Sequence, residues 1–230
     1  MPPDPGFFRE RLEAARVLLV FTPEVCGARD PVQVLGEVAE LVDIIQVRCK
    51  TRAREGLEEG TTCAAETYEW TRRVLESLHR VRKRPLVMVN DRVDVALSLW
   101  KHGCAGVHLG QEDMSVPEAR RLLGHDPLIG LSTHSLREAA DAGALDVDYL
   151  GIGPIFPSET KGYDQGVGTE LGWIVSEATH LPVFGIGGIN RERVGELSRL
   201  GRVAVSSAIL SAEDPRVAAQ ELRDLLLLSA

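Results

Sequence analysis

The sequence lacks the paired cysteines that would indicate a disulfide framework or a zinc site. Its four cysteines, Cys26, Cys49, Cys63 and Cys104, form no CxxC pair and show no spacing typical of metal ligands. We therefore expect reduced, unpaired thiols.

A surplus of positive charge is also missing. The chain has 26 Lys and Arg residues against 34 Asp and Glu residues, a net charge of −8, which argues against nucleic acid or an anionic membrane surface as the main partner. No apolar run is long enough to span a bilayer, and residues 1–17 lack the cationic and then apolar pattern of a secretory signal. These absences predict a cytoplasmic protein that binds neither nucleic acid nor membrane.

What the chain does contain is a regular alternation of strand-like and helix-like segments, after a short leading helix at 8–17. Eight apolar runs are expected to form or include strands, at residues 17–21, 43–50, 85–89, 105–109, 127–132, 148–153, 182–189 and 202–205. No linker or low-complexity break separates them. At 230 residues and 44% apolar, this pattern favours an α/β fold with one domain over 1–230, a closed (β/α)₈ TIM barrel, over an open doubly wound sheet.

The stretch 85–113 organises the expected site, because it reads as strand, helix, strand. Such a crossover makes the two strands parallel, with their carboxyl ends on one side. Asn90 and Asp91 follow the first strand, and Asp113 follows the second. Two carboxylates with room for water suit Mg²⁺, which usually completes its coordination with phosphate oxygens. A helix cap would be the commoner role of Asn90 or Asp91 alone, but together with Asp113 they favour a metal site.

Three cations accompany this acidic pair. Alternation along the second strand puts Gln46, Arg48 and Lys50 on one face, and Lys161 lies in the longest loop of the chain. A pyrophosphate with its metal would require such cations. Taken singly, Arg48 and Lys50 would more often be solvated strand-end residues, and Lys161 an ordinary loop lysine.

Two further features lie after later strands. Gly187-Gly188 and Ser206-Ser207 follow the last two strands, where barrels often bind phosphate through backbone amides. This motif indicates phosphate and says little about the reaction.

Two capping boxes narrow the choice of site residues. Ser115 and Ser135 each precede a glutamate by three residues at the start of an expected helix. With both caps assigned, Asp113 has no obvious structural role, and Ser132 and His134 are left for the strand-to-helix loop.

Seven short motifs, in this order and spacing, resemble those of the thiamine phosphate synthase family over nearly the whole chain. They are QVRCK (46–50), VND (89–91), GVHLGQED (106–113), GLSTH (130–134), GPIFPSETK (153–161), GIGGI (185–189) and VSSAI (205–209). In that family an aminopyrimidine diphosphate loses pyrophosphate, and the nitrogen of a thiazole phosphate captures the resulting cation. The resemblance thus implies a transferase that acts on small molecules with Mg²⁺ as its cofactor.

The resemblance also implies roles by motif position. Asp91 and Asp113 would hold Mg²⁺. The residues implied for the departing diphosphate are Arg48, Lys50, Asn90 and Lys161. Those implied for the pyrimidine are Gln46 and Ser132, those for the thiazole are Ser158 and Thr160, and those for its phosphate are Gly188, Ser206 and Ser207. The residues implied as catalytic are Arg48, Lys50, Ser132 and Lys161.

Two alternatives remain open at this point. One is a thiazole tautomerase of the same superfamily, in which His134 would serve as acid or base; the other is a non-catalytic phosphate-binding relative. The intact pattern of acidic and basic residues favours the synthase. His102 and His108 are assigned to the scaffold, the loop 157–168 is a candidate lid, and a homo-oligomer is left open.

Overall fold

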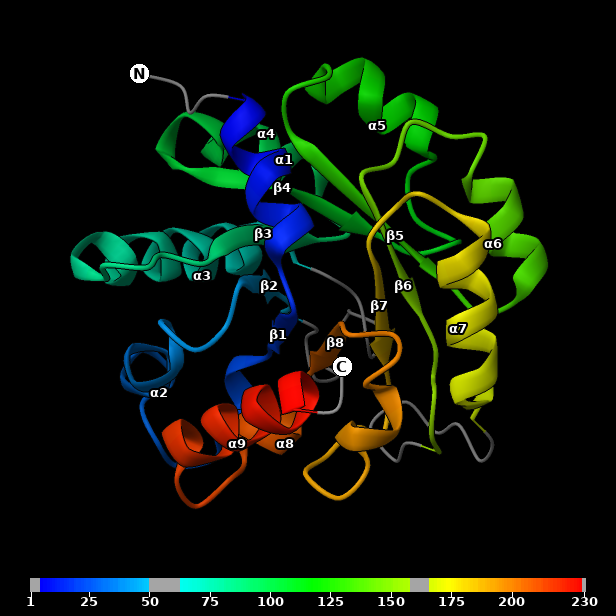
Figure 1. Ribbon diagram of the computed structural model, residues 1–230. Coiled ribbons are helices and arrows are strands. Elements are labelled where there is room, and N and C mark those ends of the chain that lie inside the picture. The colour runs from blue at the N-terminus through cyan, green and yellow to red at the C-terminus, as the bar shows by residue number, and fades with distance from the viewer. Residues whose placement is uncertain (1–4, 50–62, 158–165, 229–230) are drawn as a thin grey trace, which may run out of the picture.

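The structure is a computed structural model that describes residues 5–49, 63–157 and 166–228 (Figure 1). Eight parallel strands form a closed barrel in chain order, and β8 pairs with β1. The strands are β1 (Val17–Phe21), β2 (Ile44–Val47), β3 (Leu86–Asn90), β4 (Cys104–Leu109), β5 (Leu128–Thr133), β6 (Tyr149–Ile152), β7 (Val183–Ile186) and β8 (Val203–Val205). The predicted TIM barrel is therefore confirmed.

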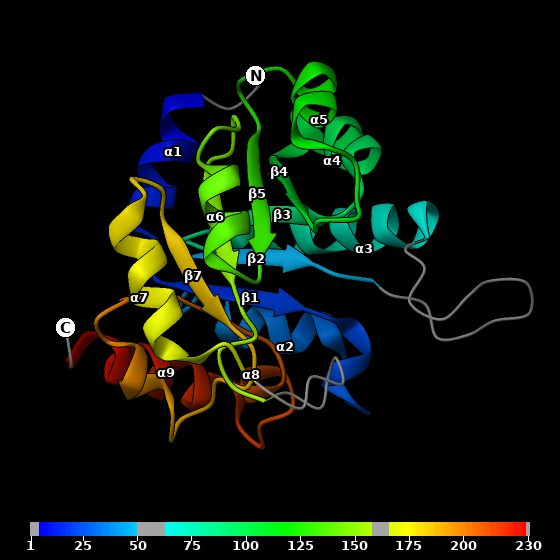
Figure 2. The ribbon, with the colours of Figure 1, turned by 90° about the vertical axis from the view of Figure 1, so that its right-hand side faces the viewer.

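Helices surround the strands. The α-helices are α1 (Pro5–Ala14), α2 (Pro31–Val38), α3 (Ala64–Ser77), α4 (Val93–Leu99), α5 (Val116–Leu123), α6 (Leu136–Ala142), α7 (Gly168–Ala178), α8 (Ser207–Leu210) and α9 (Pro215–Leu228). Short 3-10 helices are η1 (Pro23–Cys26), η2 (Leu78–Arg80), η3 (Trp100–His102) and η5 (Val194–Leu197). The last helix, α9, packs beside α2 (Figure 1), and α6 and α7 lie over β5 to β7 (Figure 2).

The alternation of side chains along the strands divides the core in two. One buried cluster, with Ile45 and Val47 of β2, lies between the strands and the outer helices. The other fills the barrel interior and contains Met88 and Phe184. Because α1 contributes Phe8 to this inner cluster, that helix closes one end of the barrel.

One connection departs from the regular alternation of strands and helices, and one expected helix cap is absent. The described connection between β7 and β8 contains the short 3-10 helix η5, where a full α-helix is typical. Just before η5, the Asn190 side chain accepts a hydrogen bond from Arg193 N at 3.2 Å. Ser115 does not accept a backbone bond at the start of α5; its hydroxyl donates to Glu118 at 2.7 Å. Ser135 caps α6 as expected, accepting from Glu138 N. No helix in the described segments has the length and apolar content needed to cross a membrane.

Candidate functional site

A polar pair lies inside the barrel at the carboxyl ends of β2 and β3. Gln46 Nε2 donates to Asn90 Oδ1 at 2.6 Å, and both side chains are 5% exposed. The bond joins the neighbouring strands β2 and β3, so the two amide side chains lie together in the barrel interior. Because the donor of Gln46 is satisfied by Asn90, the pair holds its orientation before any ligand arrives.

Asp91 follows this pair in an unusual backbone conformation. Its φ is 63°, its N–H donates to His108 O of β4 at 2.8 Å, and Arg92 N donates back to Asn90 O at 2.8 Å. The tight turn therefore attaches Asp91 to the carboxyl end of β4. Burial lowers the pKa of Arg48, while the carboxylates of Asp91 and Glu24 act in the opposite direction.

Asp113 belongs to the same edge of the barrel. Its Oδ2 accepts from Gly110 N, one residue past β4, at 2.7 Å. The expectation that Asp113 has no structural role is therefore wrong, since the carboxylate folds its own loop back onto the strand end. The bond engages one carboxylate oxygen, and the side chain is exposed. Asp91 and Asp113 are thus both held at the carboxyl end of β4, Asp91 through His108 and Asp113 through Gly110.

Ser132 lies in β5, within the predicted strand 127–132, and not in the loop that follows it. Its Oγ lies 2.8 Å from His108 Nε2, and His108 Nδ1 lies 2.9 Å from the Tyr149 hydroxyl. Gln111 Nε2 also donates to Ser132 O at 2.6 Å. The hydroxyl predicted to meet the pyrimidine is therefore the outer end of a buried chain of side chains.

His108 lies closer to the predicted site than the sequence analysis expected. It was assigned to the scaffold, and it is buried in the barrel interior, 7% exposed, where it also contacts the predicted site residue Ser132. A signal was present in the sequence: in β4, His108 alternates with Val107 and Leu109, which both belong to the outer cluster. His102, by contrast, is exposed in η3.

His134 directly follows β5 and is held by Glu138 of the next helix, α6. Its Nδ1 lies 3.1 Å from Glu138 Oε2, which also accepts from His134 N at 2.8 Å. The ring is partly exposed, so it stands at the edge of the site rather than in the barrel interior.

The predicted phosphate residues leave neighbouring strands at the same level. Ile186 pairs with Ala204, so Gly188 and Ser206 each come two residues beyond a matched pair. Gly188 has a φ of 64°, and a Cβ there would lie 2.6 Å from Pro157 O. A larger residue would therefore displace the start of the β6–α7 loop. Ser207 begins α8.

Four predicted residues fall outside the described ranges. They are Lys50, Ser158, Thr160 and Lys161. The candidate lid 157–168 lies mostly there too, so the part of it that the structure describes is its two ends. At the far end, Val167 N donates to Pro154 O at 2.7 Å and Gly168 N to Ile155 O at 3.0 Å.

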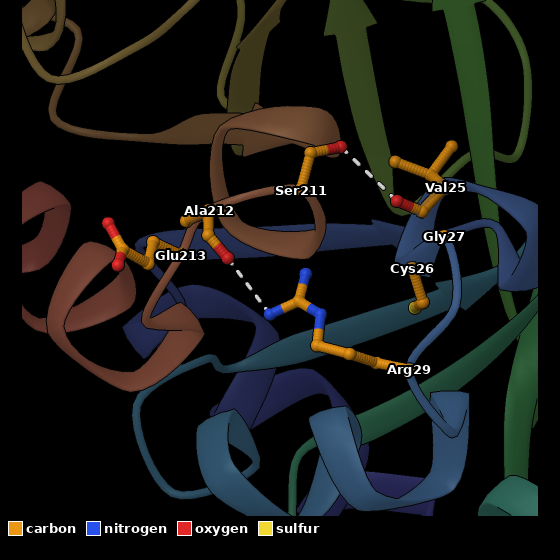
Figure 3. A pocket seen from close by; sticks show the side chains of 7 residues that line it. All are labelled: Val25, Cys26, Gly27, Arg29, Ser211, Ala212 and Glu213. Atoms are coloured by element: carbon orange, nitrogen blue, oxygen red, sulfur yellow. Dashed lines mark hydrogen bonds between the residues drawn. The ribbon is translucent and has the colours of Figure 1, made fainter.

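A shallow hollow lies on the outer rim, between η1 and the segment after α8 (Figure 3). The Arg29 guanidinium crosses it and donates to the carbonyl oxygens of Leu210 and, at 2.9 Å, Ala212. Ser211 Oγ donates to Val25 O at 3.2 Å. Arg29 and Ser211 thus bind backbone carbonyls at the hollow, and none of the described residues predicted for the site lines it.

Comparisons with known proteins agree with this geometry. The family described as thiamine monophosphate synthase matches residues 17–209. A thiamine-phosphate synthase of Shouchella clausii is 36% identical over 90% of this chain and 94% of its own length. The thiamine phosphate pyrophosphorylase structure from Pyrococcus furiosus superposes with a TM-score of 0.76 at 30% identity, covering 96% of this chain and 98% of that one.

A longer relative shows the same similarity. The thiamine-phosphate synthase of Synechococcus sp. strain WH7803 is 38% identical over 95% of this chain, but the match covers 59% of that relative, so this chain spans less than two thirds of its length. The family match covers most of the chain and the barrel agrees with it. The chain belongs to the thiamine monophosphate synthase family.

Proposed function

We propose that this chain joins 4-amino-2-methyl-5-hydroxymethylpyrimidine diphosphate to a thiazole phosphate, giving thiamine phosphate and pyrophosphate. The observation that carries the proposal is the grouping of the buried Gln46–Asn90 pair with Arg48 and Asp91 at the ends of β2 and β3. A site for this substrate needs amide groups that hydrogen-bond to the pyrimidine ring. It also needs cations and a metal that bind the diphosphate leaving group.

The donors at this edge fit Mg²⁺. Within 5–49, 63–157 and 166–228, no group of three or more His, Cys, Asp and Glu side chains forms a complete metal cage. Two carboxylates, Asp91 and Asp113, match a cation that keeps waters and substrate phosphate oxygens as its other ligands. When bound, Mg²⁺ would neutralise charge that develops on the departing pyrophosphate.

The remaining roles are those that the family resemblance implies by motif position, and Lys50, Ser158, Thr160 and Lys161 lie outside the described residues. Arg48 and Asn90 would bind diphosphate oxygens, with Lys50 and Lys161 as further cations. Gln46 and Ser132, on the barrel interior, would orient the pyrimidine. Ser158 and Thr160 would contact the thiazole, and the backbone of Gly188, Ser206 and Ser207 would hold its phosphate.

This assignment suits a dissociative displacement. Loss of pyrophosphate requires stabilisation of the leaving group, alignment of the incoming nitrogen and exclusion of water, and it requires no strong base. The half-buried Arg48 and the buried Asn90 would stabilise the leaving group, and the buried Gln46 would orient the pyrimidine within a largely apolar barrel.

The tautomerase alternative depends on His134. The His134–Glu138 pair could move a proton, which is the observation that favours it. The synthase is preferred because a tautomerase would not need the diphosphate residues on β2 and β3. We expect substitution of Asp91 or Asp113 to reduce turnover far more than His134→Ala does.

The decisive experiment is to incubate the protein with both substrates and Mg²⁺ and to measure thiamine phosphate. Asp113→Asn removes the charge but keeps an oxygen that can accept from Gly110 N, so the loop should stay folded. We expect turnover to fall at least about 100-fold. Asp126→Asn is the matched control, because Asp126 is exposed and outside the site. No product from the parent protein, with exchange of the thiazole tautomers instead, would favour the alternative.

A further inference from the structure

Three side chains from adjacent strands form a buried chain in the barrel interior. Tyr149 of β6 bonds to His108 of β4, and His108 bonds to Ser132 of β5, at 2.9 and 2.8 Å. The chain runs from the fully buried phenol toward the half-buried Ser132 hydroxyl. It therefore links the apolar centre of the barrel to the predicted pyrimidine site.

Two glycines make room for this chain. A Cβ at Gly130 would lie 2.1 Å from Tyr149 Cζ, and a Cβ at Gly151 would lie 3.4 Å from His108 Cε1. In the β5–β6 pairing, Gly130 lies opposite Tyr149 and Gly151 lies opposite Ser132. Each strand therefore has a glycine, with no side chain, beside the buried rings. The two rings thus occupy a slot that the neighbouring strands leave open.

The Tyr149 hydroxyl decides the direction of the hydrogen bonds. Burial raises the pKa of Tyr149, so the phenol keeps its proton. A buried O–H needs an acceptor, and within the described residues the acceptor in reach is His108 Nδ1. An Nδ1 that accepts carries no proton, so the ring proton lies on Nε2.

We propose that His108 is a positioning residue that sets the hydrogen-bond direction of Ser132. Tyr149 donates to Nδ1, the Nε2–H donates to Ser132 Oγ, and the Ser132 proton is left to point into the pocket. Ser132 then presents a donor to its ligand. This inference rests on the proposed function, in which the group that accepts from Ser132 is an unprotonated ring nitrogen of the pyrimidine diphosphate.

This direction has a consequence for specificity. A site that presents a fixed donor discriminates against rings that offer an N–H or C–H at the same place, because the buried donor would lose its partner. With the opposite tautomer, Ser132 would donate to His108 and present only lone pairs. The Tyr149 hydroxyl, remote from the ligand, would thereby select which ring is bound.

The first test reads the tautomer directly in the free protein. Long-range ¹H–¹⁵N spectra distinguish the two neutral tautomers of histidine, and His108→Gln identifies the His108 signals among the six histidines. We expect the neutral Nε2–H form. An Nδ1–H form, or a ring protonated on both nitrogens at neutral pH, would overturn the proposal.

The second test removes the phenol proton and keeps the ring. Tyr149→Phe retains the edge contact with Phe184, at 5.6 Å between centroids, and removes only the donor. We expect mixed His108 tautomers and an about tenfold higher KM for the pyrimidine diphosphate, the loss of about one hydrogen bond, with an unchanged KM for the thiazole phosphate. Tyr68→Phe, on exposed α3, is the matched control.

The outcomes separate this proposal from the proposed function. Mixed tautomers with an unchanged KM for the pyrimidine diphosphate, or an equal rise in both KM values, would refute the role of His108. A parent protein without synthase activity would refute the function, whereas the tautomer is read without substrate and still tests the direction of the chain.

Discussion

Asp91 shows how one residue can combine a backbone role with a chemical one. Among the described residues it is the non-glycine position with a positive φ, 63°. Asp and Asn adopt this left-handed conformation more readily than other residues with a Cβ. The turn that points Asp91 along the barrel edge therefore restricts the residue type, independently of any metal.

We predict that Asp91→Ala and Asp91→Asn separate these two roles. Alanine should lower the free energy of unfolding by about 1 kcal/mol relative to asparagine, because it is strained in the left-handed region. Both variants should lose synthase turnover to a similar extent, since both lose the charge. Urea denaturation and product formation measure the two effects, and equal stability of the variants would contradict the backbone argument.

Gly130 gives a second prediction at this scale. Gly130→Ala would place a methyl group within 2.1 Å of the Tyr149 ring, so the ring must move and His108 would lose its partner. We expect a loss of about 1–3 kcal/mol in the free energy of unfolding, as for overpacked cores. Gly36→Ala in α2 is the control: a Cβ there meets no atom within 4 Å, and helix formation should gain about 0.5–1 kcal/mol. Thermal or urea unfolding of both variants tests the opposite signs.

At the scale of elements, α1 seals the barrel. Phe8 packs in the inner cluster and against Trp100, with 5.5 Å between ring centroids, while the adjacent Phe7 is 48% exposed. Arg9 anchors the helix through Asp148, at 3.0 Å. The strand ends that carry the predicted site residues are at the opposite end of the barrel, so α1 should affect stability and not substrate binding.

The neighbouring phenylalanines provide a matched test. Phe8→Ala should lower the free energy of unfolding by about 3 kcal/mol, because it leaves a cavity in the inner cluster. Phe7→Ala should change it by less than about 0.5 kcal/mol. KM values should be unchanged in both variants. A raised KM for Phe8→Ala would show that the packing of α1 is coupled to substrate binding.

At the scale of the whole molecule, one carboxylate joins the start of the first strand to the last helix. Asp43 Oδ2 accepts from Arg16 N at 2.9 Å and Val17 N at 3.1 Å, and lies 3.0 Å from Arg223 of α9. Lys83, before β3, lies 3.0 Å from Oδ1. Burial would raise the pKa of Asp43, but these donors and cations outweigh it, so the pKa lies below its ordinary value.

The sign of this shift predicts a pH dependence. A depressed folded-state pKa means that Asp43 contributes stability above its unfolded pKa of about 3.9, and that this contribution is lost as the pH falls through the lower folded value. Asp43→Asn should lower the free energy of unfolding by about 2 kcal/mol at pH 7, and the difference should shrink below about pH 4. Urea unfolding across pH measures it, with Asp126→Asn as the control. A difference that does not vary with pH would contradict the electrostatic account.

The sequence alone was enough to predict the barrel and to place the candidate site residues at the carboxyl ends of its strands. Apolar runs with a strand period alternate with helical segments, and that local pattern also places Gln46, Asn90 and Ser132 where parallel strands end. The order of the motifs also indicated the family, and the family match over residues 17–209 confirms it. Each of these inferences depends on local patterns and on their order along the chain.

Only the tertiary structure decided which polar groups bind one another. The Gln46–Asn90 bond joins residues 44 apart, and the His108–Tyr149 bond joins residues 41 apart. Closing the barrel brings such residues together, and no local period encodes that meeting. For this reason the sequence predicted candidate site residues at one end of the barrel, whereas the buried contacts of His108 and the anchoring of Asp113 on Gly110 N became visible only in the folded barrel.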